Sequence, residues 1–115
     1  MQVPRYFLPI NDSIAYVSEL YAKKIWVINY SSGNILTTIP TQSWTEKMIK
    51  IGSSVFVQQK YNSLIANSIP SILKINTLSH TVELNKTLAG GDITGMVKDK
   101  LDRIWVAVDE DTATT

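Results

Sequence analysis

Short apolar runs alternate with polar turns along the chain. The runs are rich in Ile, Val, Tyr, Phe and Trp, and Gly, Asn, Ser, Pro and Asp bound them. No stretch has the spacing of an amphipathic helix. The pattern predicts strands at Ile14–Ser18, Lys24–Asn29, Asn34–Ile39, Lys47–Ile51, Val55–Gln58, Ile72–Asn76, Thr81–Leu84, Thr94–Lys98 and Arg103–Val108. It therefore indicates an all-β protein without a helix.

These runs form a repeat. SIAYVS, SSVFVQ and DRIWVAV each place an aromatic residue before a valine, at spacings of 40 and 49 residues. KIWVINYSSGNI also matches SILKINTLSHTV, which aligns Asn29 with Asn76, and Met48 aligns with Met96. Four strands recurring about every 40 to 50 residues are typical of a β-propeller blade. The sequence therefore predicts a β-propeller fragment.

Strand counting divides residues 1–115 into about two and a half four-stranded antiparallel blades of one partial propeller. The predicted units are residues 6–40, residues 44–88 and a partial third at residues 93–109. Trp26 and Trp105 are expected in the core between blades, because inner strands are buried on both faces. A ring needs typically 4–8 blades. We therefore expect an internal fragment of a longer propeller, the alternative being several copies assembled into one ring.

Composition argues against several classes of function. The 11 basic and 10 acidic residues are interspersed, so no nucleic-acid partner is expected. The chain has no cysteine and one histidine, and neither a metal nor a cofactor is predicted. His80 is expected to be a solvated turn residue, and no catalytic constellation is evident, so the chain is not expected to be an enzyme. The N-terminal residues lack the pattern of a signal peptide.

The loops predict one functional face. In such blades, the loops between second and third strands and between blades lie on one face, and here these loops hold the richest side chains. Aromatic groups can stack on a planar ligand or a glycan while a few polar groups orient it. The candidate ligand-binding residues are Glu19, Tyr21, Trp44, Glu46, Gln59, Tyr61 and Asp92. The alternative is structural: Trp44 and Tyr61 cover neighbouring blades, and Glu46 bonds local backbone.

The phrase AYVSELYAKKIWVINYSSGNILTTIP resembles the YVTN-type repeat of bacterial surface-layer propellers. The phrases TEKMIKIGSSVFVQQ, ILKINTLSHTVEL and GMVKDKLDRIWVAVDED are similar to YncE-like cell-surface lipoprotein propellers of Bacteroidetes. Asn29 and Asn76 depart from the pattern, since the family usually has aspartate there. The resemblance implies an exported, lipid-anchored propeller, and some family members capture cobalamin for an associated outer-membrane transporter.

The expected function is therefore that of a binding module of a bacterial cell-surface or periplasmic propeller. Its ligand would be a small molecule such as a corrinoid, or a glycan, held on the aromatic-rich loop face. An outer-membrane transporter or another envelope protein is the expected partner, and open blade edges would permit self-association. The alternative function is a structural or protein-interaction propeller without a small-molecule ligand.

Overall fold

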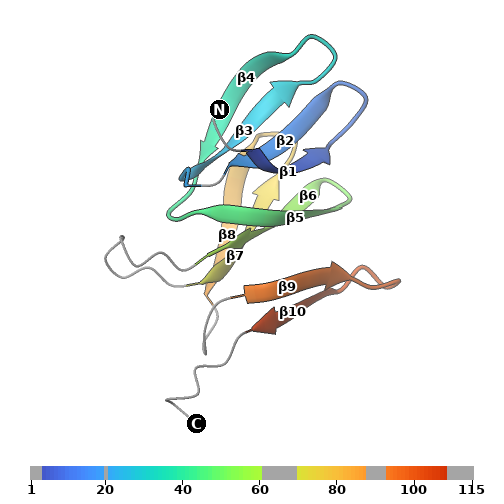
Figure 1. The fold of residues 1–115 in the computed structure, drawn as a ribbon. Coiled ribbons are helices and arrows are strands. Elements are labelled where there is room, and N and C mark those ends of the chain that lie inside the picture. The colour runs from blue at the N-terminus through green and yellow to red at the C-terminus, as the bar shows by residue number, and fades with distance from the viewer. Residues whose placement is uncertain (1–3, 20, 61–69, 88–92, 109–115) are drawn as a thin grey trace.

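The computed structural model describes residues 4–19, 21–60, 70–87 and 93–108, and these residues are all-β (Figure 1). The strands are β1 (Pro4–Pro9), β2 (Ile14–Glu19), β3 (Lys24–Asn29), β4 (Asn34–Pro40), β5 (Thr45–Ile51), β6 (Ser54–Gln59), β7 (Ser71–Asn76), β8 (Thr81–Thr87), β9 (Ile93–Lys98) and β10 (Ile104–Val108). Each predicted strand is present, with ends that differ by at most a few residues. The additional strand is β1, whose two terminal prolines weaken the strand pattern. None of the described segments forms a helix with the length and apolar character that a membrane span requires.

The strands form three antiparallel sheets. Sheet A has the order β1-β2-β3-β4, sheet B has the order β5-β6-β7-β8, and sheet C pairs β9 with β10. Strands that are consecutive in sequence are neighbours in each sheet, which short connections allow. Figure 1 shows the sheets stacked in chain order, with β5 lying between β1 and β9 and contacting both. The predictions of an all-β protein and of four-stranded antiparallel units are confirmed.

Two apolar cores join the sheets. The core between sheets A and B contains Tyr16, Ile25, Val27, Ile39, Met48, Val55, Val57, Leu73 and Ile75. The core between sheets B and C contains Ile72, Ile93 and Met96, with Ile49, Phe56, Ile104 and Val106 packed against it. Sheet B is therefore covered on both faces. The outer strand β8 is exposed along its whole length and β4 along most of it.

One set of cross-strand pairs faces the preceding sheet. These rear pairs join the first and second strands of each sheet, and they are Phe7–Val17, Met48–Val57 and Met96–Val106. Met48 and Val57 pack against sheet A, and Met96 and Val106 pack against sheet B. The three pairs are equivalent in register, so the valine of each repeated phrase has the same place in its sheet.

The next cross-strand pairs face the following sheet, because successive side chains of a strand point to opposite faces. These front pairs are Leu8–Tyr16, Ile49–Phe56 and Val97–Trp105. Tyr16 packs into the core shared with sheet B, and Phe56 into the core shared with sheet C. The repeated aromatic–valine phrase thus supplies one side chain to each face of every sheet.

The two end sheets differ from sheet B in what covers them. Phe7 is 50% exposed although its equivalents Met48 and Met96 are each 1% exposed. Trp105 is 58% exposed, whereas its equivalent Tyr16 is fully buried. The expectation that Trp105 lies in a core between blades is wrong for the described chain, because no described sheet covers the front of sheet C. Trp26 is half-buried on the rear face of sheet A.

Candidate ligand-binding site

The connections divide between two edges of the stacked sheets. The turns β1–β2, β3–β4, β5–β6, β7–β8 and β9–β10 share one edge, the turn edge, and Figure 1 shows several of them projecting to the same side. The β2–β3 and β4–β5 connections leave the opposite, loop edge. On the turn edge, side-chain oxygens of Asn11, Asn29, Asn76 and Asp99 accept hydrogen bonds from backbone N–H groups of their own turns. These residues are committed to local turn structure.

His80 occupies a turn, as expected, but is only partly exposed to solvent. Its Nδ1 atom lies 2.6 Å from the hydroxyl oxygen of Tyr16, and the two rings meet edge to face at 5.6 Å. The His80 φ of 56° belongs to the left-handed region, in which histidine is enriched among non-glycine residues. The expectation of a fully solvated side chain is not met, because the β7–β8 turn packs onto sheet A. His80 is a structural contact between two sheets.

Tyr21 and Trp44 come together on the loop edge. Their ring centroids are 5.0 Å apart and the ring planes meet at 75°, an edge-to-face arrangement. Tyr21 is 67% exposed with a φ of 68°, and Trp44 is half-buried. The contact links the β2–β3 and β4–β5 connections. It leaves aromatic surface open to solvent at the edge where a ligand-binding face was expected.

Glu19 and Trp26 form a buried contact beneath that edge. The indole Nε1–H of Trp26 donates to Oε1 of Glu19 at 2.8 Å, and Glu19 is 7% exposed. This bond joins the end of β2 to the middle of β3 on the rear face of sheet A. Glu19 therefore supports the loop edge from below. Tyr61 and Asp92, two further candidates from the sequence, lie outside the described residues.

Gln59 is also a buried support. It is 2% exposed, and its Oε1 accepts the backbone N–H groups of Gln42 and Ser43 at 2.9 and 3.1 Å. Its Nε2 donates to the hydroxyl of Ser71 at 2.8 Å. The amide thereby fixes the β4–β5 connection to the adjoining ends of β6 and β7. Three of its hydrogen-bonding positions are used within the protein.

A cleft of about 660 Å³ opens between the first strands of the three sheets, towards the loop edge. It is lined by Arg5, Tyr6, Glu46, Lys47, Gln58, Lys60, Ile93, Thr94 and Gly95. Most of these residues belong to the first strands of the sheets, β1, β5 and β9. In each of these strands, two of them stand one and two residues before the rear-pair residue. The stacking of β1, β5 and β9 therefore creates the cleft. Gln58 crosses its base, donating from Nε2 to the backbone oxygen of Ile93 at 2.5 Å.

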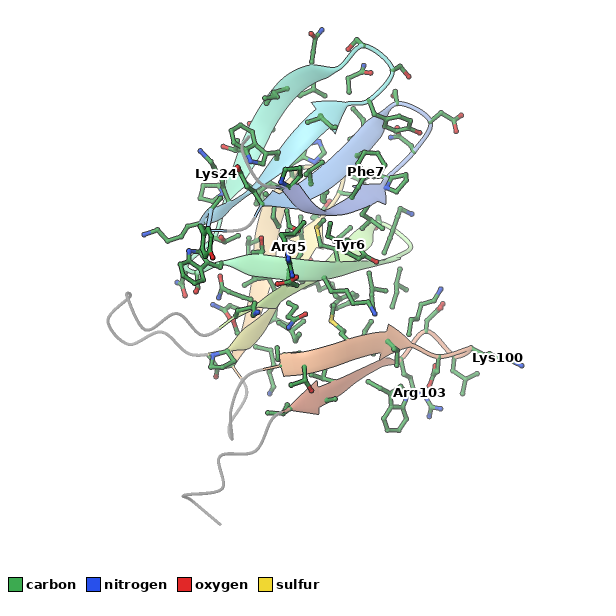
Figure 2. The ribbon with its side chains drawn as sticks, viewed as in Figure 1. Arg5, Tyr6, Phe7, Lys24, Lys100 and Arg103 are labelled. Carbon is green, nitrogen blue, oxygen red and sulfur yellow. The ribbon has the colours of Figure 1, made fainter. Side chains whose placement is uncertain are left out.

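The cleft carries more positive than negative side chains. Arg5 donates from Nε and Nη2 to Oε1 of Glu46 at 2.9 and 2.5 Å, and Figure 2 shows its side chain directed from β1 towards β5. The Nζ of Lys60 lies 3.5 Å from Oε2 of the same carboxylate. Lys47 forms no ion pair with any other residue that the structure describes. The cleft lining thus holds three cationic side chains and one carboxylate, so it favours an anionic group.

The sequence pattern pointed to Glu46 but missed Arg5, Lys47 and Lys60. Single basic residues in strands are usually solvated, and no local sequence pattern distinguished Arg5, Lys47 and Lys60 from such residues. A signal was nevertheless present, because Arg5 and Glu46 stand two residues before the equivalent Phe7 and Met48. Residues at equivalent offsets on the first strands converge when the sheets stack.

Comparison with known protein families and with characterised proteins gave no match. In the described ranges, no group of three or more His, Cys, Asp or Glu side chains is arranged to hold a metal ion. The side chains that line the cleft offer guanidinium, ammonium, carboxylate, amide, phenol and hydroxyl groups, and an aromatic pair lies on the same edge.

Proposed function

We propose that this chain contributes successive blades to a β-propeller and binds the anionic group of a small-molecule ligand in the cleft between β1, β5 and β9. The single observation that carries the proposal is the cleft itself, which Arg5, Lys47, Lys60 and Glu46 line and in which Glu46 pairs with Arg5 and Lys60. Its volume of about 660 Å³ is within the range typical of small-molecule sites. The repeated rear and front pairs support the propeller, since like sheets stack in a fixed order.

A corrinoid of the cobalamin type is the first ligand to test. Such a molecule carries a phosphodiester group that cationic side chains of the cleft can bind, and a large ring with a polar rim that would lie outside the cleft. The ring would stack on the aromatic surface of Tyr21 and Trp44, which share the loop edge with the cleft. The likeness to YncE-like propellers supports the same ligand. A place at the cell surface or in the periplasm, and transfer to an outer-membrane transporter, rest on that likeness alone.

The proposal is tested by titrating the protein with cobalamin and following heat and tryptophan fluorescence. We expect saturable binding that Lys47→Ala weakens about tenfold, as the loss of one charge-assisted contact would. Leu78→Ala is the matched control, because Leu78 is 83% exposed on the turn edge and should not affect binding. Absence of binding at micromolar cobalamin would rule out a corrinoid as the ligand.

A glycan carrying a carboxylate or sulfate is the next ligand class to titrate by the same method, since the same cations would hold it. If neither the corrinoid nor the anionic glycan binds, the alternative function is favoured. This alternative is a structural or protein-interaction propeller of the cell envelope, and the exposed apolar faces of sheets A and C favour it. It predicts that Lys47→Ala and Trp44→Ala leave the capture of protein partners unchanged.

A further inference from the structure

Sheets A and C each present an apolar face that no described part of the chain covers. The rear face of sheet A holds a shallow recess of about 410 Å³ lined by Pro4, Arg5, Tyr6, Phe7, Val17 and Ile28. Figure 2 shows Phe7 on the side of β1 opposite to Tyr6, which faces sheet B. The front face of sheet C presents Val97 and Trp105, which are 55% and 58% exposed. One end of the stack is hollowed and the other carries a large aromatic side chain.

The chain itself shows how two such faces pack together. At the boundary of sheets A and B, the front-pair residue Tyr16 shares a core with Met48 and Val57, the rear pair of sheet B. At the boundary of sheets B and C, Phe56 packs in the same sense against the core that contains Met96. In both cases an aromatic residue of a second strand meets the rear pair of the following sheet. Trp105 and Phe7–Val17 hold the equivalent positions at the two ends of the described stack.

We propose that two copies of this chain associate head to tail, with Trp105 of each copy seated in the Phe7–Val17 recess of the other. The inference goes beyond ligand binding and does not depend on it. A second copy fits because this chain carries both halves of the contact, in the register that its own two boundaries use. The contact continues an arrangement already present twice within one molecule.

Head-to-tail contact determines the form of the assembly. A heterologous contact gives a closed ring when its rotation closes, and an open filament when it does not. With the three described sheets of each copy, two copies bring together four four-stranded and two two-stranded sheets, a number of sheets within the 4–8 blades typical of closed propellers. Front-to-front contact is less suitable, since it would oppose two protruding Trp105 side chains and leave both recesses empty. We therefore expect a closed pair with two identical contacts.

The experiment measures solution mass by light scattering after size exclusion, over a range of micromolar concentrations. We expect the wild-type chain to have twice the mass of one copy, and Phe7→Lys and Trp105→Lys each to have the mass of one copy. An equimolar mixture of these two variants should regain the doubled mass, at higher concentration, because one of its two contacts is unaltered. Loss of the doubled mass in both single variants, with recovery in the mixture, is specific to head-to-tail association. A front-to-front pair would be lost only in Trp105→Lys, and a rear-to-rear pair only in Phe7→Lys.

Leu78→Lys is the control for the added charge and should keep the doubled mass. Far-ultraviolet circular dichroism checks that each variant is folded, as expected for substitutions at exposed positions. The proposal is overturned if the wild type has the mass of one copy throughout, as it would if the two faces receive other sheets of the same repeat. It is also overturned if either single variant keeps the doubled mass, or if the mixture does not recover it.

Discussion

The hydroxyl oxygen of Tyr16 lies 2.6 Å from Nδ1 of His80, across the boundary between sheets A and B. Tyr16 is fully buried and is in the second strand of its sheet, whereas His80 is in the β7–β8 turn. The bond joins residues 64 positions apart in sequence. It adds a polar contact to the apolar core between these sheets, so it fixes how the β7–β8 turn sits against sheet A.

Replacing Tyr16 with Phe should lower the free energy of unfolding by about 1 kcal/mol, because one intramolecular hydrogen bond is lost and the ring is kept. His80→Asn should have a similar cost, since asparagine tolerates the left-handed backbone but is shorter than histidine. Urea denaturation of both single variants and the double variant measures the coupling. The two costs should not add, and full additivity would contradict an energetic role for this bond.

Alkaline pH should destabilise the wild-type protein through Tyr16. Burial raises the pKa of Tyr16 from 10.0 to about 12. Below pH 10 the tyrosine is protonated in both the folded and unfolded states, so it adds no pH dependence. Between pH 10 and about 12 the unfolded chain releases this proton and the folded chain keeps it. The free energy of unfolding therefore falls as the pH rises.

The change expected from Tyr16 over this range is roughly 2 kcal/mol, from a pKa difference of about two units. Denaturation of the wild type and of Tyr16→Phe at several pH values measures it. The variant retains every other titrating group, so the difference between the two proteins should shrink and then reverse as the pH rises. A constant difference across the range would mean that the pKa of Tyr16 is unaltered by folding.

Asp99 should remain ionised in the β9–β10 hairpin at unusually low pH. The Trp105 indole Nε1–H donates to its Oδ2 at 2.8 Å, and the Arg103 backbone N–H donates to its Oδ1 at 3.0 Å. These bonds, with the Trp105 bond the largest cause, lower the pKa of Asp99 from 3.8 to about 2. The contribution of Asp99 to stability is therefore complete above its unfolded pKa and is lost as the pH falls towards 2.

Trp105→Phe tests the main cause of this shift. The variant keeps an aromatic ring and removes the indole donor, so the pKa of Asp99 should move up towards its ordinary value. Carboxyl carbon chemical shifts, followed by nuclear magnetic resonance during an acid titration, report the pKa directly. Asp102 is a matched internal reference, since it is in the same turn and is not a partner of Trp105. An unchanged pKa of Asp99 would contradict the assignment.

Gln59→Leu should be more destabilising than the loss of a single surface hydrogen bond. The substitution leaves the backbone N–H groups of Gln42 and Ser43 without the oxygen that accepts them at the β4–β5 connection, where Ser43 is buried. We expect a loss of about 2–4 kcal/mol, because buried donors without a partner are costly. Gln42→Ala is the control, since that side chain is exposed and its loss should cost little. Thermal or urea denaturation measures both, and equal costs would contradict a supporting role for Gln59.

Much of the fold could be predicted from local pattern. The residues of β3 and β6 are continuous apolar runs, and the turns beginning at Asn29 and Asn76 hold their own backbone N–H groups. Such features depend on neighbours in sequence, so they can be read without a structure. The β1 strand was harder to recognise because prolines stand at both its ends. The aromatic–valine phrase indicated a repeat but not which face each side chain covers.

The candidate site could be predicted only in part. The loop edge was predicted, and Tyr21 and Trp44 do meet there. The cleft was not predicted, because Arg5 and Glu46 are 41 residues apart and meet only when β1 and β5 lie side by side. His80 likewise acquired its role only through the packing of one sheet on another.

By itself, the sequence determined strands, turns and a repeating unit, because these follow from alternation along the chain and from the backbone preferences of single residues. Tertiary structure alone decided which equivalent residues are buried. Phe7 and Met48 hold the same register in their sheets, yet one is 50% exposed and the other 1% exposed. The physical reason is that burial depends on the presence of a neighbouring sheet, and local pattern contains no information about that neighbour.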